Sequence, residues 1–250
     1  MTETDLTWDA ITRDFRILQR RRGHRYSLDD LATAAEAAQL TPDARRVVDL
    51  GCGIGSVLLM VAWKLDHAQV WGIEALAQSI ELARRSVHAN GIAHRVTLLQ
   101  GDLRELTVAW TGPRVDLVTG TPPYLPQGTA LPSPDPQRAA ARIELRGGVE
   151  AYLEAASRIV ARDGRVVVCA DGRHPERVVA GAARASLVPV RRRDVIPREG
   201  AAPLFAVWTL RPREREGEVL PTLETHEAVM RDADGVRTAQ ARAMRAVFGL

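Results

Sequence analysis

The sequence predicts an α/β fold with a doubly wound, mostly parallel sheet of seven strands. Two observations support this prediction. Short apolar runs alternate with longer helical segments along most of the chain, and one early run leads directly into three alternating glycines. Strands that alternate with helices form parallel sheets whose two faces the helices cover. Ligands of such sheets bind at the carboxyl ends of the strands, near the point where the strand order reverses.

Length and composition are those of one globular domain with short appendages, since the chain has 250 residues, 46% of them hydrophobic and 26% charged. We expect residues 1–43 to cover the substrate or cofactor, residues 44–210 to form the cofactor-binding domain, and residues 211–250 to pack on that domain. No apolar run approaches the ~20 residues of a membrane helix, and the first residues lack a secretory signal. We therefore expect a cytoplasmic protein without membrane contact.

The N-terminal part is expected to contain a hairpin and one helix. Residues 14–26 alternate loosely around the turn-like Arg21-Arg22-Gly23, which predicts an irregular strand or a hairpin. Ser27 has the acid Asp30 three residues after it, as in a capping box. The alanine-rich run 28–40, with leucines at helical spacing, then predicts a helix that Thr41-Pro42 ends.

The rest of the chain alternates between the two kinds of element. Strands are expected over residues 46–50, 69–73, 96–100, 115–119, 165–170, 188–195 and 204–210. Helices are expected over residues 57–65, 76–90, 149–161 and 175–185, and a last helical stretch over 240–248 lies in the tail.

The turn after the first of these strands predicts a site for a nucleotide-like cofactor. Asp49 stands near the end of the strand, and Gly51, Gly53 and Gly55 follow. Glycines allow a tight turn and leave bare amides against which a ligand can lie, facing the start of the next helix. NAD-binding folds use a similar turn. The acid at Asp49 favours S-adenosylmethionine, because a carboxylate can balance the ammonium group of that cofactor.

Acids also stand at the ends of the next two strands. Glu74 is placed where a carboxylate can accept hydrogen bonds from both hydroxyls of a ribose, which suits NAD and S-adenosylmethionine equally. Asp102 can accept a hydrogen bond from the amine of an adenine, and Leu103 can pack on the ring. Such an acid is often only a helix cap. Three acids at successive strand ends favour the cofactor site.

The fourth strand leads into Thr121-Pro122-Pro123-Tyr124, our candidate for the chemistry. Prolines fix φ and donate no backbone hydrogen bond, so the carbonyls of Thr121 and Pro122 can point outward as acceptors. Tyr124 offers a flat face on which a planar substrate can stack. Such a site would hold an amine with its lone pair toward a methyl donor, which is catalysis by positioning. The alternative is a rigid exit turn with a core tyrosine.

The basic residues are almost all arginines, since Lys64 is the single lysine among the 34. Arginine grips phosphate or carboxylate in two places and stacks on bases. Clusters gathered around one site would therefore favour an anionic partner such as RNA, whereas isolated clusters would be a solvated surface. There are three clusters: Arg20 to Arg22 with Arg25; Arg138, Arg142 and Arg146; and Arg191 to Arg193.

The second cluster lies next to the candidate chemistry. Residues 125–148 are rich in proline and are expected to form a loop that covers the substrate. Arg138 and Arg142 would make the substrate anionic if they face the pocket. Glu144 is expected to be their salt-bridge partner rather than a catalytic base.

These motifs together resemble a class I S-adenosylmethionine-dependent methyltransferase of the Asn-Pro-Pro-Tyr type, which implies a Rossmann-like fold. More narrowly, the chain is similar to the bacterial family that methylates N6 of an anticodon-loop adenine in a valine tRNA. Three further segments are similar: QRRRGHRYSLD at residues 19–29, Pro197-Arg198-Glu199-Gly200, and Thr225-His226-Glu227.

The resemblance implies a role for each candidate residue. The cofactor's methionine moiety would be held by Asp49, Gly51 and Gly53, its ribose by Glu74 and its adenine by Asp102. The target amine would be held by Pro122 and Tyr124. We expect the substrate itself to contact Tyr26, Arg138 and Arg142.

Thr121 departs from the family, because it stands where the family has asparagine and offers a short hydroxyl in place of a carboxamide. We expect an adenine N-methyltransferase that acts on tRNA. The alternatives are a small-molecule N- or O-methyltransferase and a non-catalytic binder of the cofactor or of RNA. The six histidines lack metal-ligand spacing, so we expect no metal. The oligomeric state is left open.

Overall fold

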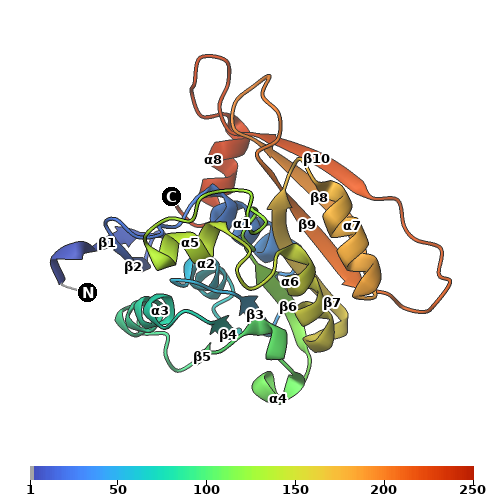
Figure 1. The fold of residues 1–250 in the computed structure, drawn as a ribbon, viewed down its shortest axis with the longest axis horizontal. Helices are drawn as coiled ribbons and strands as arrows, with labels where there is room; N and C mark the ends of the chain where they lie inside the picture. Colours follow the sequence, from blue (N-terminus) through green and yellow to red (C-terminus); the bar gives the residue numbers. More distant parts are fainter. Residues whose placement is uncertain (1–2) are drawn as a thin grey trace.

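The computed structural model describes residues 3–250, which form a small N-terminal hairpin and a central sheet flanked by helices (Figure 1). The strands of the central sheet lie in the order β10-β8-β9-β7-β6-β3-β4-β5. Only β9 runs antiparallel to its neighbours, β7 and β8. Their bounds are β3 (Arg46–Leu50), β4 (Gln69–Glu74), β5 (Val96–Gln100), β6 (Val115–Gly120), β7 (Val160–Asp171), β8 (Leu187–Ile196), β9 (Phe205–Pro212) and β10 (Glu224–Val229).

The predicted α/β class and mostly parallel sheet are confirmed, but the sheet has one more strand than expected. The added strand, β10, pairs in parallel with β8 at the edge of the sheet. Its residues are mostly exposed and polar, so the segment lacks the apolar run by which the other strands were recognised.

The central strands are buried on both faces, which explains why they read as continuous apolar runs. Val47 and Val167 belong to the core on one side, and their neighbours Val48 and Val166 belong to the core on the other. The first side is covered by α1 (Leu28–Leu40), α2 (Ser56–Lys64), α3 (Ala77–Ala89) and α8 (Ala239–Ala246). The second side is covered by α6 (Val149–Ile159) and α7 (Pro175–Arg184), which lie side by side (Figure 1).

Four short helical segments complete the chain. The 3-10 helices η1 (Glu3–Asp5) and η2 (Leu103–Glu105) stand at the N-terminus and after β5, and α4 (Val108–Thr111) precedes β6. The fourth, α5 (Pro136–Arg142), lies within the segment that was expected to be a loop. Asp135 caps it by accepting a hydrogen bond from the backbone of Arg138 at 3.0 Å.

The N-terminal hairpin was predicted, but its turn was misplaced. Strands β1 (Leu6–Ala10) and β2 (Arg16–Arg20) pair antiparallel, so the chain reverses over residues 11–15 rather than at Arg21-Arg22-Gly23. The Thr12 hydroxyl organises the turn by accepting from the Phe15 amide at 2.9 Å. The hairpin is attached to α3, because the Leu18 amide donates to the Ser86 hydroxyl at 2.9 Å.

The helix α1 begins and ends where the capping signals predicted. The Ser27 amide donates to the Asp30 carboxylate at 3.0 Å, which is one half of the capping box.

No helix within residues 3–250 combines the length and apolar character that crossing a bilayer requires.

Candidate active site

A cavity of about 650 Å³ opens at the carboxyl ends of the central strands. The strand order reverses between β3 and β6, and the segments that follow both strands contribute to the cavity wall. The volume is within the roughly 300–1,000 Å³ of small-molecule sites. The cavity therefore lies where a doubly wound sheet binds its ligands.

The glycine turn forms one wall of this cavity. All three glycines have positive φ, at 58° for Gly51, 55° for Gly53 and 90° for Gly55, a region that favours glycine. A Cβ at Gly51 would clash with the hydroxyl of Tyr152, whereas a Cβ at Gly53 would come no closer than 4.0 Å to another atom. Gly51 and Gly53 line the cavity and expose bare backbone to it; Gly55 is outside the lining and caps α2.

Asp49 lies behind the glycine turn rather than in the cavity wall. Its side chain accepts hydrogen bonds from the Thr119 hydroxyl at 2.8 Å and the Leu58 amide at 3.2 Å, and the residue is 2% exposed. Burial raises the pKa of Asp49 to about 7. Its charge would reach a ligand only through the intervening turn.

Glu74 lines the cavity and is linked to the glycine turn. Its carboxylate accepts from the Gly53 amide at 3.0 Å and from the Leu76 amide at 2.6 Å, and burial raises its pKa. The residue thus holds the turn in place while presenting an anionic group at the end of β4.

Asp102 and Leu103 line the cavity at the end of β5. The guanidinium of Arg104 forms two hydrogen bonds to the Asp102 carboxylate, at 2.9 and 2.6 Å, and these lower its pKa. Asp102 also caps η2, so the helix-cap interpretation applies alongside the ligand-facing one. The glycine backbone of the turn, with carboxylates at two strand ends, fits the methionine, ribose and adenine parts of S-adenosylmethionine.

Thr121, Pro122, Pro123 and Tyr124 line the same cavity directly after β6. The Thr121 hydroxyl donates to Asp30 Oδ1 at 3.3 Å. The Tyr124 hydroxyl is 3.2 Å from Asp29 Oδ2 and 3.0 Å from Cys169 Sγ, and burial raises its pKa. The structure therefore brings the predicted cofactor wall and the predicted chemistry into one cavity.

Asp29 and Asp30, at the start of α1, are the main site residues that sequence reasoning missed. From the sequence, Asp30 was expected to be a capping acid and Asp29 to end the segment 19–29 that resembles the family. Asp30 is 6% exposed, and burial together with the neighbouring Asp29 raises its pKa well above the usual value. The sequence signal that could have revealed them is Asp29, a second acid beside Asp30, because a capping box requires only one. His24, Asp171 and Arg173 also line the cavity and were not expected there.

Two of the three expected substrate contacts are outside the cavity. The Tyr26 hydroxyl donates to the carbonyl of Ala10 at 3.2 Å, and Arg138 Nε donates to the carbonyl of Gly23 at 3.2 Å. Arg142 lines the cavity, together with Arg146. Because α5 ends at Arg142, Arg146 lies beyond the helix.

The other two arginine clusters are largely engaged in ion pairs within the protein. Arg191 and Arg193 hold the buried Glu36 at 2.9 and 2.8 Å, and Arg192 pairs with Asp194 at 2.7 Å. In the first cluster, Arg20 bridges Asp5 and Asp135, and Arg25 pairs with Asp9. The clusters are therefore not one free basic surface.

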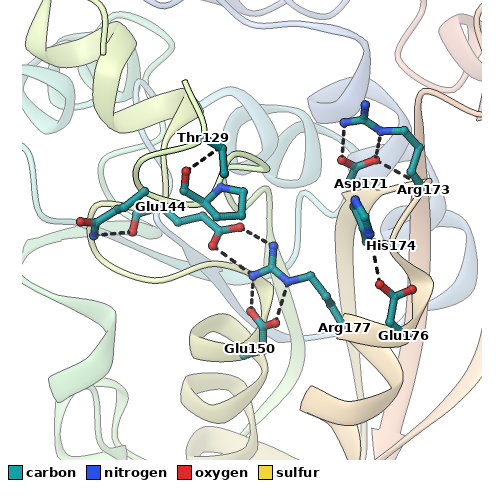
Figure 2. Close-up of polar contacts among 10 residues, drawn as sticks. Thr129, Glu144, Glu150, Asp171, Arg173, His174, Glu176 and Arg177 are labelled. Atoms are coloured by element: carbon teal, nitrogen blue, oxygen red, sulfur yellow. Dashed lines mark hydrogen bonds and ion pairs between the residues drawn. The ribbon is translucent and has the colours of Figure 1, made fainter. Parts of the chain in front are cut away.

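Ion pairs anchor the segment that covers the cavity, as Figure 2 shows. Arg177 of α7 reaches Glu144 of that segment at 2.6 Å and Glu150 of α6 at 2.7 Å. The prediction that Glu144 pairs with Arg138 and Arg142 was wrong. The chain turns after α5, so Glu144 faces α7 instead. Within residues 3–250, no group of three or more His, Cys, Asp or Glu is arranged to hold a metal ion.

Comparisons with known proteins agree with this fold. A family model described as a methyltransferase domain matches residues 47–143. The predicted O-methyltransferase Atu636 of Agrobacterium tumefaciens has the same fold, with a TM-score of 0.64 and 19% identity over 88% of this chain and 96% of that chain. The protein is a class I S-adenosylmethionine-dependent methyltransferase.

Within that class, the chain is similar to the bacterial tRNA1(Val) (adenine(37)-N6)-methyltransferases. It is 29% identical to the enzyme of Tolumonas auensis over 73% of this chain and 76% of the relative. It is also 40% identical to the release factor glutamine methyltransferase of Geobacter sulfurreducens, but over only 36% of this chain and 30% of that relative.

Proposed function

We propose that the protein transfers a methyl group from S-adenosylmethionine to the exocyclic amine of an adenine in tRNA. The observation on which this depends is that Thr121-Pro122-Pro123-Tyr124 lines the same cavity as the glycine turn. An amine held by the first motif would lie beside a cofactor held by the second. The similarity to tRNA adenine methyltransferases over most of the chain supports the choice of substrate.

The cofactor half of the cavity would work through backbone and carboxylate groups. The exposed backbone of Gly51 and Gly53 would hold the methionine moiety, with Asp49 balancing the ammonium group through the turn. Glu74 would accept from the ribose hydroxyls. Asp102 would accept from the adenine amine while Leu103 packs on the ring.

The substrate half would position the target amine. The Pro122 carbonyl and the Thr121 oxygen would accept hydrogen bonds from its two N–H groups, and the Tyr124 ring would stack on the base. When bound, S-adenosylmethionine would supply an activated methyl group: the nitrogen would bond to the methyl carbon as the carbon–sulfur bond breaks with both electrons on sulfur, and the nitrogen proton would pass to solvent. Alignment and exclusion of water by these residues are the enzyme's contribution.

The cavity rim would receive the RNA. Arg142 and Arg146 line the cavity and would face phosphates, and the half-exposed Leu145 and Leu204 would contact flanking bases. Residues 1–43 would cover the site, because His24, Asp29 and Asp30 line the cavity. Residues 44–210 would be the catalytic domain, and residues 211–250 would pack on it. A tRNA substrate would place the protein in the cytoplasm.

The test is transfer of radiolabelled methyl by the purified protein to unmodified bulk tRNA, to protein and to small molecules from a lysate. Label in tRNA that digests to N6-methyladenosine would support the proposal. Label confined to small molecules would replace it with a small-molecule methyltransferase. Label on a glutamine of a release factor would instead assign a protein substrate.

A further inference from the structure

Thr121 forms a hydrogen bond to an acid that another element brings to the cavity wall. Its hydroxyl donates to Asp30 Oδ1 at 3.3 Å, across 91 residues of sequence. Both residues line the cavity, and Asp30 is 6% exposed. Burial raises the pKa of Asp30, whereas the hydrogen bonds from the Ser27 amide and the Thr121 hydroxyl favour its ionised form.

The capping box fixes the orientation of the Asp30 side chain. Asp30 Oδ2 accepts from the Ser27 amide at 3.0 Å, which leaves Oδ1 facing Thr121. The neighbouring Asp29 meets the Tyr124 hydroxyl at 3.2 Å, so the start of α1 contacts both ends of the motif. The carboxylate is thus held rigidly toward the Thr121 hydroxyl.

This contact sets the polarity that Thr121 presents to the cavity. A hydroxyl has one proton and two acceptor lone pairs. When Asp30 is ionised, the Thr121 proton is committed to its Oδ1 atom and only lone pairs remain for a substrate. The Thr121 oxygen then acts as an acceptor, as the oxygen of a carboxamide would. A proton on Oδ1 would reverse this hydrogen bond and turn the Thr121 proton toward the cavity.

We propose that Asp30 is a positioning residue that turns Thr121 into a hydrogen-bond acceptor for the target amine. The inference depends on the proposed function, since it assumes a planar substrate with an exocyclic amine. An acceptor at Thr121 makes the site selective for nitrogen over oxygen nucleophiles. An amine can donate a hydrogen bond to the Thr121 lone pairs, whereas a phenolate or alkoxide oxygen has no hydrogen to donate and would be repelled by them.

The test compares two nucleotides that differ only in the exocyclic amine: adenosine 5′-monophosphate and purine riboside 5′-monophosphate. Their binding to the protein saturated with S-adenosylhomocysteine is measured by calorimetry. The wild type should bind the adenine nucleotide about tenfold more tightly, which is the scale of one satisfied hydrogen bond at a buried site.

The variant Asp30→Asn should abolish this preference. Because the Ser27 amide still requires an acceptor, the carbonyl of the introduced carboxamide would face Ser27 and its NH₂ group would face Thr121. The Thr121 proton would then point into the cavity and oppose the amine. Affinity for S-adenosylhomocysteine itself should stay within about twofold of wild type.

Thr121→Val identifies the route of the effect. It should lower the preference as Asp30→Asn does, and the double variant should lose no more than either single variant. Additive losses would mean that Asp30 acts independently of Thr121. Asp194→Asn is the matched control, because Asp194 is also a buried acid, 8% exposed, and is outside the cavity lining; it should keep the wild-type preference.

The two proposals fail in different ways. A wild type that binds both nucleotides equally would overturn the adenine-amine function and the inference with it. A wild type that prefers the adenine nucleotide, with Asp30→Asn retaining that preference, would overturn the role of Asp30 alone. In a tRNA methylation assay, Asp30→Asn should lower kcat about tenfold with an unchanged KM for the cofactor.

Discussion

The carboxyl group of Asp49 is buried beside a cavity that we propose receives a cation. Burial raises its pKa to about 7, so near neutral pH the group is only partly ionised. Its hydrogen bonds to Thr119 and Leu58 favour the charged form but do not outweigh the desolvation. A cofactor ammonium group behind the glycine turn would add the missing stabilisation of the carboxylate.

Cofactor binding should therefore depend on pH. The pKa of the folded free protein is raised, so protonation of Asp49 competes with the ammonium group at low pH. The Kd for S-adenosylmethionine should decrease about tenfold between pH 6 and pH 8. Calorimetry at several pH values measures this change.

The variant Asp49→Asn should bind more weakly and show a flatter pH profile, with the remaining slope due to Glu74. Because the pKa of Asp49 is higher in the folded than in the unfolded protein, the wild type loses folding stability as the pH rises from the unfolded pKa toward about 7. Asp49→Asn lacks this loss, so its stability relative to the wild type should be greater at pH 8 than at pH 5. An identical pH profile in wild type and variant would exclude Asp49 from cofactor binding.

At the scale of elements, one arginine ties the segment over the cavity to the helices α6 and α7. Arg177 of α7 joins Glu144 of the covering segment to Glu150 of α6, and Figure 2 shows its guanidinium between the two carboxylates. These side chains are largely buried, so removing the arginine would leave two carboxylates close together without a counter-charge.

Arg177→Met should therefore loosen residues 125–148. We expect proteolytic cleavage in this segment to become about tenfold faster and the KM for tRNA to rise, with cofactor affinity unchanged. Arg84→Met is the matched control, because Arg84 pairs with Glu81 at 3.9 Å on an exposed part of α3. Equal cleavage of wild type, Arg177→Met and Arg84→Met would show that the ion pair does not hold the segment.

The elements of the core were predictable because their signals are local. Strands such as β3 and β5 have the predicted bounds, since apolar runs end at turn residues. The strand β10 was missed because it is an exposed edge strand held by backbone hydrogen bonds to β8. The turn of the hairpin was misplaced because Thr12, which has no distinctive local signal, organises it.

At the scale of the whole molecule, the sheet gathers a site from segments far apart in sequence. The glycine turn and the Thr121 motif were predictable because each is a short motif at a strand end. The contacts of Asp30 with Thr121 and of Arg177 with Glu144 were not, because they depend on how α1 and α7 pack. Whether an arginine is paired likewise depends on residues far away in the sequence, as with Arg193 and Glu36.

The distribution of paired arginines predicts how tRNA binding responds to salt. Arg142 and Arg146 line the cavity, whereas Arg193 is committed to Glu36 at 2.8 Å. Replacing either Arg142 or Arg146 by Met should weaken tRNA binding and reduce the slope of log K against log salt by about one. Arg193→Met should leave that slope unchanged, since Arg191 still pairs with Glu36. Filter binding across a salt series measures both effects, and equal slopes for all variants would place the RNA elsewhere.

The most direct test of the central claim, that one cavity holds both the cofactor and the target amine, is a crystal structure with S-adenosylhomocysteine and adenosine 5′-monophosphate. We predict the homocysteine moiety against Gly51 and Gly53, the second adenine stacked on Tyr124, and its amine about 3 Å from the Pro122 carbonyl and the Thr121 oxygen. A cofactor product bound outside the glycine turn, or an adenine whose amine points away from Pro122, would contradict the account.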